Sequence, residues 1–143
     1  MFRSESPLSA EEELVVTQAV DAGFTVHSEL GPGFRERIYE RAYCLELDSR
    51  GIRYECEKRI EVRYKKWLIP GQTIDLVIEG IVLVELKTVP QLKPIHRAQV
   101  ISYRKAMGLK VGLIMNFNAE LFKAGIKRVV HTPRPPATRL QAP

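Results

Sequence analysis

The sequence predicts one α/β domain in which helices cover a mixed β-sheet. Apolar residues repeat at helical spacing over the first fifty positions and alternate as in strands between Ile52 and Leu86. A helical segment then separates two further strand-like runs. Strands that follow one another directly, together with strands joined through a helix, form a sheet with helices packed on it. A chain of 143 residues has the size of one ordinary domain.

Two helices are expected in the N-terminal part of the chain. Ser9 followed by Glu12 fits a capping box, so the first helix is predicted from Ala10 to about His27. The segment Gly31-Pro32-Gly33 interrupts the pattern. A second helix is predicted from Phe34 to Ser49, because its apolar residues again recur at helical spacing.

The remaining elements follow from a change of period. A third helix is predicted from Pro94, which suits a first helical turn, to Met107, and a short helical turn from Ala119 to Lys123. A turn is predicted at Pro70-Gly71. Strands are predicted at residues 52–57, 60–68, 74–78, 81–86, 111–117 and 126–130.

The ends of the chain and its cysteines suggest a protein of the cytoplasm. Residues 1–9 are expected to form a flexible N-terminus, residues 10–130 the single domain, and residues 131–143 a disordered, proline-rich tail. No stretch approaches the roughly 20 apolar residues that span a bilayer, and no apolar signal segment is present, so no membrane partner is expected. Cys44 and Cys56 are interpreted as reduced structural thiols.

Glu85 and Lys87 end a strand that is otherwise apolar. Alternation places Leu83, Glu85 and Lys87 on one face of the segment from Ile81 to Lys87. Both faces begin apolar, which predicts a strand covered on both sides. A carboxylate at the end of such a strand is costly to bury unless a cation or strong donors meet it. Lys87 or a metal ion could be that partner.

Asp75 lies on the preceding strand, and the turn between the strands decides its relation to Glu85. A two-residue turn at Glu79-Gly80 would put Asp75 and Glu85 on opposite faces. A three-residue loop, Ile78-Glu79-Gly80, would set Asp75 opposite Leu83, so that Asp75 and Glu85 become diagonal neighbours about 7–8 Å apart. Gly80 favours this loop, because the last residue of such loops takes a left-handed conformation.

Two carboxylates beside a lysine can hold Mg²⁺, a hard cation that takes oxygen ligands and keeps several waters, with Mn²⁺ as a substitute. The ion can lower the pKa of a bound water and neutralise charge on a phosphate. Lys87 could orient that water or stabilise the developing charge. The alternative is a same-face salt bridge between Glu85 and Lys87, with Asp75 exposed.

Other polar residues could join this site. His96, Gln99 and Tyr103 are spaced i, i+3 and i+7 on the third helix and form one polar stripe. Such long side chains could reach a phosphate or the waters of a metal, and the alternative is a solvated helix face. Glu36 lies in the first turn of the second helix, where the helix dipole alone would favour a glutamate.

Five blocks of residues, from about residue 12 to 130, jointly carry a family resemblance. They are Gly33, Glu36 and Tyr39 in GPGFRERIYE; Asp75 in TIDLVIEG; Glu85, Leu86 and Lys87 in VLVELK; His96, Gln99 and Tyr103 in IHRAQVISYRK; and Asn116, Phe117 and Asn118 before GIKRVV. In this order the blocks resemble the GxxExxY protein family, a branch of the PD-(D/E)XK nuclease superfamily. One departure is Ile74, which stands where the superfamily's name has a proline.

The resemblance implies a restriction-endonuclease-like core with a central four-stranded mixed β-sheet flanked by helices. It also implies that Asp75 and Glu85 are metal ligands, with Glu36 as a further helical carboxylate near the metal. Lys87 would be the catalytic lysine. Gln99 and Tyr103 match the QxxxY element of RecB-like and lambda-exonuclease-like members and join the catalytic set.

Basic residues point to an anionic partner. The net charge is +5, and part of the excess falls on one predicted strand and its approach, at Lys58, Arg59, Arg63, Lys65 and Lys66. Together with His96, these residues could follow a phosphate backbone while interleaved aromatic rings stack on bases. The alternative is a solvated edge strand whose lysines discourage aggregation.

The leading hypothesis is Mg²⁺-dependent hydrolysis of phosphodiester bonds in nucleic acid, with DNA as the expected substrate. The alternative is a non-catalytic nucleic-acid- or protein-binding module that keeps the nuclease fold. The combination of carboxylates, lysine and glutamine favours catalysis, because binding alone does not need this set. Assembly into a homo-oligomer, or with a protein partner, is left open by the sequence.

Overall fold

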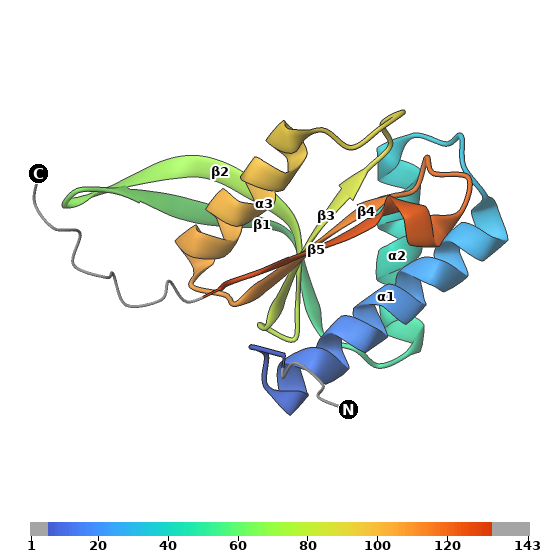
Figure 1. Cartoon of the computed structure of the whole chain (residues 1–143), viewed down its shortest axis with the longest axis horizontal. Coiled ribbons are helices and arrows are strands. Elements are labelled where there is room, and N and C mark those ends of the chain that lie inside the picture. The colour runs from blue at the N-terminus through green and yellow to red at the C-terminus, as the bar shows by residue number, and fades with distance from the viewer. Residues whose placement is uncertain (1–5, 133–143) are drawn as a thin grey trace, which may run out of the picture.

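The computed structural model describes residues 6–132, which form a five-stranded sheet packed between helices (Figure 1). The strands lie across the sheet in the order β1-β2-β3-β4-β5, and β3 with β4 is the parallel pair among them. The elements are α1 (Ala10–Leu30), α2 (Glu36–Ser49), β1 (Tyr54–Tyr64), β2 (Trp67–Ile78), β3 (Val82–Lys87), α3 (Pro94–Met107), β4 (Val111–Asn116), the 3₁₀ turn η1 (Phe122–Gly125) and β5 (Ile126–Val130).

The predicted α/β class is confirmed, with one correction to the strand count. The described sheet has five strands, whereas four were expected, because β5 returns antiparallel to β4 and covers its edge. The parallel pair arises where α3 carries the chain from the end of β3 back to the start of β4. All six residues of β4 are buried, as befits a strand that has a neighbour on each side and a covered surface on each face.

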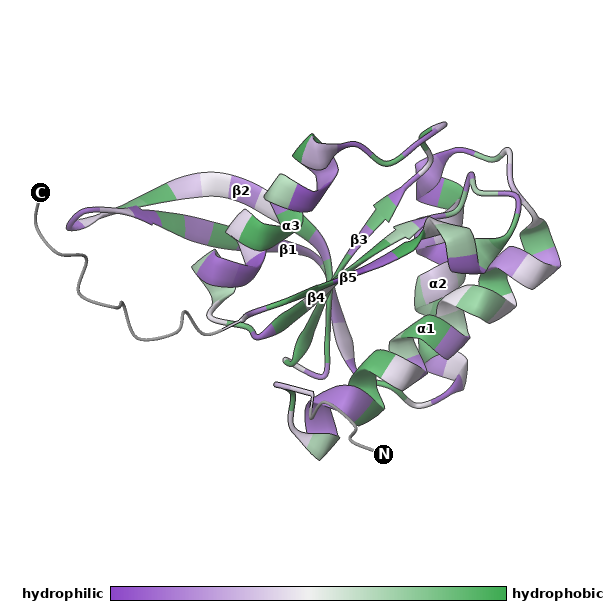
Figure 2. Ribbon diagram, viewed as in Figure 1, coloured by the Kyte–Doolittle hydropathy of each residue, from purple (hydrophilic) through white to green (hydrophobic). Residues whose placement is uncertain are grey.

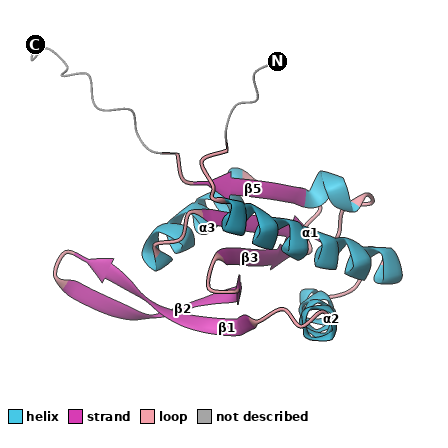
Figure 3. Cartoon of the chain, turned by 90° about the horizontal axis from the view of Figure 1, so that it is seen from below, coloured by secondary structure: helices cyan, strands magenta, loops and turns pink. Residues whose placement is uncertain are grey.

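Helices cover the sheet on both faces. Alternate residues of β3, such as Val82 and Val84, pack in the cluster that contains the buried residues of α1 and α2. Leu83, which points the other way, packs with Val100 of α3. Figure 2 shows apolar residues concentrated along β3 and β4, and Figure 3 shows the sheet in the perpendicular view, with the β1–β2 hairpin reaching beyond the helices.

The long β1–β2 hairpin corrects the predicted turn at Pro70-Gly71. The chain reverses instead at Lys65 and Lys66, between the paired residues Tyr64 and Trp67. The two strands expected on either side of residues 58–59 therefore merge into β1. Pro70 and Gly71 fall within β2, where the register shifts by one residue. A proline, which has no N–H to donate, is tolerated at such an irregularity.

The turn between β2 and β3 is a three-residue loop, but its residues are shifted by one from the prediction. Ile78 pairs with Val82, so the loop is Glu79-Gly80-Ile81. Both Glu79 and Gly80 have positive φ angles, of 53° and 67°. The observed register places Asp75 directly opposite Glu85, whereas a diagonal relation was predicted.

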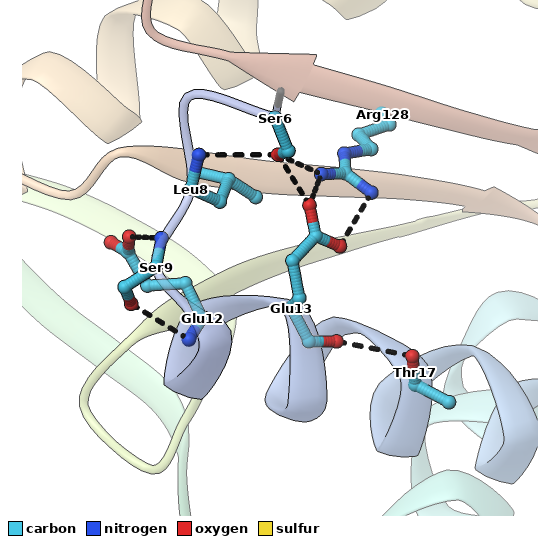
Figure 4. A network of polar contacts seen from close by, with 7 residues as sticks. All are labelled: Ser6, Leu8, Ser9, Glu12, Glu13, Thr17 and Arg128. Carbon is cyan, nitrogen blue, oxygen red and sulfur yellow. Dashed lines mark hydrogen bonds and ion pairs between the residues drawn. The ribbon is translucent and has the colours of Figure 1, made fainter. Parts of the chain in front are cut away.

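The N-terminal helix is fixed at its first turn (Figure 4). The predicted capping box is confirmed: the Glu12 N–H donates to the Ser9 hydroxyl at 3.1 Å, and the Ser9 N–H donates to the Glu12 carboxylate at 2.8 Å. Arg128 of β5 forms an ion pair with Glu13 of α1. Within the stretch expected to be a flexible N-terminus, Leu8 is buried in the core, whereas residues 1–5 and 133–143 lie outside the described part.

Between residues 6 and 132 the structure contains no helix with the length and apolar character that a bilayer span requires.

Candidate active site

Asp75 and Glu85 face each other at the point where β2 and β3 separate. Backbone pairing of these strands ends at Leu76 and Val84, and the next pair along is bonded through side chains instead. The Asp75 N–H donates to the Glu85 carboxylate at 3.0 Å, and the Leu86 N–H donates to the Asp75 carboxylate at 2.8 Å. The two carboxylates are thus held together by the backbone of the opposite strand.

Glu57 extends this pair into a row across three strands. It lies between the residues of β1 that pair with Leu76 and Ile74, which places it opposite Asp75. Its φ angle is +51°, a left-handed conformation that costs a non-glycine residue about 1 kcal/mol or more. The alternation of β2 changes at the same level, because Leu76 packs with α1 and α2 whereas Ile74 packs on the α3 side. Strained backbone of this kind is concentrated at functional sites.

A third element brings Glu40 to the same place. Carboxylate oxygens of Glu40 (α2), Glu57 (β1) and Asp75 (β2) all lie within 4.8 Å of one another. Glu40 and Glu57 were not among the site residues predicted from the sequence. Glu40 follows Glu36 by four residues and therefore lies on the same face of α2, a spacing that could have revealed it. Glu57 gave no such signal, because its position depends on an irregularity in β1.

Burial raises the pKa values of three carboxyl groups of this site, those of Glu85, Glu40 and Asp75. Burial, followed by the charge of Asp75, raises the pKa of Glu85 to about 8, and only 6% of Glu85 is exposed. Burial raises the pKa of Glu40 to about 7, although a bond from the Cys56 thiol opposes the shift. Burial also raises the pKa of Asp75, and the Leu86 N–H opposes it. The site therefore gathers more carboxyl groups than its own donors can keep ionised.

Lys87, the lysine predicted from the sequence, supplies positive charge to this site. It lies two residues beyond Glu85 on the same face of β3, and its positive charge lowers the pKa values of both Asp75 and Glu85. Its ammonium group donates to the side-chain oxygen of Gln99 on α3 at 3.0 Å. Tyr103, one turn further along α3, has its pKa raised by burial and then by the charge of Glu85.

This donor set fits a hard divalent cation. All the groups that converge are carboxylates, and oxygen ligands are what Mg²⁺ and Mn²⁺ prefer. The raised pKa values of Glu40, Asp75 and Glu85 suit cation ligands, since a bound cation would favour their ionised forms. Asp75 belongs both to the three-carboxylate cluster and to the bonded pair with Glu85, so it stands at the centre of the row.

Glu36 and Tyr39, which carried part of the family resemblance, occupy different surroundings. Glu36 is an exposed residue at the start of α2, and its pKa is raised by partial burial and then by the charge of Asp75. Tyr39 is fully buried. Its hydroxyl donates to the Gly31 carbonyl at 2.5 Å and accepts the Phe34 N–H at 3.1 Å. Tyr39 therefore fastens the Gly-Pro-Gly loop that precedes the helix carrying Glu36 and Glu40.

Asn116 similarly fixes the backbone that follows Lys87. Its side-chain oxygen accepts the Val89 N–H at 3.1 Å, and its amide donates to the Val89 carbonyl at 2.9 Å. The Phe117 N–H donates to the Lys87 carbonyl at 2.9 Å. The Asn116-Phe117-Asn118 block thus fixes the position of Lys87 through contacts with the main chain.

The residues predicted to bind nucleic acid lie on the β1–β2 hairpin and at the start of α3. Four of them lie on the exposed surface of the β1–β2 hairpin: Arg59, Arg63, Lys65 and Lys66. Lys58 forms an ion pair with Glu55 at 2.6 Å. His96 accepts the Lys93 N–H at 2.9 Å through Nδ1 and so caps the first turn of α3. This nitrogen of His96 is therefore engaged in the helix cap.

One comparison with known proteins gave a match. The family model described as the PD-(D/E)XK nuclease superfamily matches residues 13–129, and the mixed sheet flanked by helices is consistent with the core of that superfamily. The comparisons with curated proteins and with solved structures gave no match. The narrower assignment to the GxxExxY family stays a prediction. Because the matched segment covers most of the chain and contains the whole carboxylate row, the chain belongs to the PD-(D/E)XK nuclease superfamily.

Proposed function

We propose that this protein hydrolyses phosphodiester bonds in DNA with the help of Mg²⁺, for which Mn²⁺ can substitute. The observation that carries the proposal is the row of carboxylates centred on Asp75 and Glu85, in a chain of the nuclease superfamily. Asp75 and Glu85 would hold the ion, as the sequence predicted. Glu57 and Glu40 would add ligands from β1 and α2. Glu36, whose pKa is raised by burial and then by the charge of Asp75, would bind a water on the ion.

The chain's own residues have separate tasks in this proposal. A bound divalent ion supplies charge neutralisation and a water of lowered pKa. Lys87, oriented by its bond to Gln99, stabilises the negative charge that develops on the phosphate. Tyr103 lies beside the same charges on α3 and positions the substrate phosphate. The backbone bonds between β2 and β3 keep the two central carboxylates at a fixed separation, so the site is organised before the substrate arrives.

Cleavage of labelled DNA and RNA by the purified protein in Mg²⁺, in Mn²⁺ and in EDTA tests the proposal. We expect cleavage of DNA in either metal and none in EDTA. Asp75→Asn keeps an oxygen that can accept the Leu86 N–H but removes the charge, and it should lower the rate by at least about 100-fold. Lys87→Ala should lower the rate by a similar factor while leaving metal binding in place.

Matched control variants separate these effects from changes in folding. Asp21→Asn alters an exposed carboxylate of α1, and Lys123→Ala removes an exposed lysine of η1; both should retain the wild-type rate. Calorimetric titration with Mn²⁺ should show binding to the wild type and Lys87→Ala, but not to Asp75→Asn. Metal binding without cleavage of any nucleic acid would refute hydrolysis and favour a binding module.

A further inference from the structure

We infer that the β1–β2 hairpin binds unpaired bases of the substrate, so that this nuclease acts on nucleic acid with a single-stranded segment. The inference rests on the proposed function and names its substrate class. The arm is defined as residues 58–74, the part of the hairpin beyond the acidic row, and it projects from the body of the molecule (Figure 1). Its tip consists of Tyr64, Lys65, Lys66 and Trp67.

One face of the arm is apolar, and within residues 6–132 no other element buries it. Val62 pairs with Ile69 and Tyr64 pairs with Trp67 across the two strands, so alternation sets all four side chains on the same face. Between 40% and 56% of each residue is exposed. Four large apolar side chains at the end of a two-stranded ribbon contribute little to a core, which favours a role in contact with a partner.

The aromatic residues at the tip have the geometry of a stacking platform. The Tyr64 and Trp67 rings stack on each other at a centroid distance of 6.3 Å, with an angle of 19° between their planes. Lys65 lies 5.4 Å from the centre of the Tyr64 ring, and Lys66 lies 5.0 Å from that of Trp67. Exposed rings beside ammonium groups can bind a base and its phosphate together. Lipid and protein partners do not require an ammonium group placed beside each ring.

The platform faces the same side of the sheet as the catalytic lysine. Val62 and Tyr64 alternate in phase with Ile60, which packs on the α3 side together with Leu83. Lys87 is in phase with Leu83 on β3. Trp67 is eight residues from Asp75 along β2, which corresponds to about 25 Å in an extended strand. A single strand of nucleic acid with a base stacked on the tip would therefore run along the arm toward Asp75 and Glu85.

Unpaired bases are the occupants that this surface fits best. The bases of a duplex are stacked on one another, and their faces are not accessible to a protein ring, whereas the bases of a single strand can stack on exposed rings. The positive side chains at the tip supply contacts to phosphates on either side of the stacked base. The arm would thus select overhangs, flaps or single strands over an uninterrupted duplex.

Tryptophan fluorescence provides a direct test, because Trp67 is the only tryptophan in the sequence. The full-length protein is titrated in EDTA, which prevents cleavage, with a 20-nucleotide single strand and with the matching blunt duplex. We expect the single strand to quench Trp67 and to bind at least tenfold more tightly than the duplex. Equal affinity for the two, or binding without a change in fluorescence, would overturn the inference.

Variants of the tip separate stacking from charge. Trp67→Leu keeps an apolar side chain but removes the ring, and fluorescence anisotropy of a labelled single strand should show about tenfold weaker binding. Trp67→Phe should restore most of that loss. The double change Lys65→Ala with Lys66→Ala should reduce the slope of log affinity against log salt by about 1.4. The control pair Lys110→Ala with Lys123→Ala, both exposed and outside the arm, should not change it.

Failure of this inference can be told apart from failure of the proposed function. If the wild type cleaves DNA in Mg²⁺ and Trp67→Leu binds single strands as tightly as the wild type, the proposed function stands and base binding by the arm is refuted. Strong quenching by single strands without any cleavage refutes hydrolysis and keeps the arm as a binding surface. Sedimentation of wild type and Trp67→Leu completes the test: if the substitution dissociates a dimer and leaves the affinity for single strands unchanged, the apolar face is a self-association surface and the inference is wrong.

Discussion

Replacing Glu85 with glutamine should stabilise the metal-free protein at alkaline pH. The pKa of Glu85 is raised from 4.5 to about 8, chiefly by burial and by the charge of Asp75. The unfolded chain therefore loses this proton near pH 4.5, whereas the folded protein keeps it until about pH 8. The free energy of unfolding falls as the pH rises between these values and stays low above them.

The magnitude follows from the size of this pKa difference. At 1.36 kcal/mol per pKa unit, Glu85 weakens the folded state by at most about 5 kcal/mol above pH 8. A glutamine oxygen can still accept the Asp75 N–H, so part of this loss should be recovered. We expect a gain of about 2 kcal/mol at pH 8.5, equivalent to roughly 7 °C in the thermal midpoint, and little change at pH 5.

Thermal unfolding followed by circular dichroism in EDTA measures this effect, with Glu120→Gln as an exposed control. In 10 mM Mg²⁺ the order should reverse, because an ion that binds only the folded state raises the midpoint of the wild type and not that of Glu85→Gln. A wild type that is equally stable at pH 5 and pH 8.5 in EDTA, or a variant that is less stable than the wild type at both pH values, would contradict the raised pKa of Glu85.

Three further substitutions test the parts of the fold that hold the site. Gly112→Ala would set a Cβ 2.5 Å from the buried Val100 side chain, so urea titration should show a loss of about 1–3 kcal/mol; an unchanged midpoint would contradict this packing of α3 on β4. Tyr39→Phe removes the hydroxyl that bonds the loop at Gly31 and should cost about 1–2 kcal/mol by the same measurement. Asn116→Ala should speed hydrogen exchange of the Val89 amide, because the Asn116 side chain accepts this N–H. Protection equal to that of the wild type would show that Asn116 does not fix the backbone after Lys87.

Helices and buried strands were predictable because their patterns are local. The third helix, from Pro94 to Met107, and the last strand, from Ile126 to Val130, have the predicted bounds. The turn of the first hairpin was misplaced because Pro70-Gly71 is a stronger turn signal than Lys65-Lys66. There the cross-strand contact of Tyr64 with Trp67 outweighs local preference, and no local pattern reports such a contact.

The candidate site was only partly predictable for a related reason. A shared face for Asp75 and Glu85 follows from strand alternation and a three-residue loop, although which three residues form the loop depends on packing. Glu57 joins the row only because β1 takes a left-handed residue at that level, and Glu40 only because α2 packs beside it. Contacts between elements distant in sequence cannot be deduced from the spacing of residues within one element.

The ion pair between Glu13 and Arg128 has a consequence for how the chain is made. The ion pair joins the first helix to the strand Ile126–Val130. Because these elements lie at opposite ends of the domain, the helix leaves the ribosome long before its partner strand is synthesised. Until Ile126–Val130 emerges, β4 presents a row of unpaired backbone groups flanked by apolar side chains. Translation that stopped just short of this strand would therefore release a fragment with an open sheet edge, which favours aggregation.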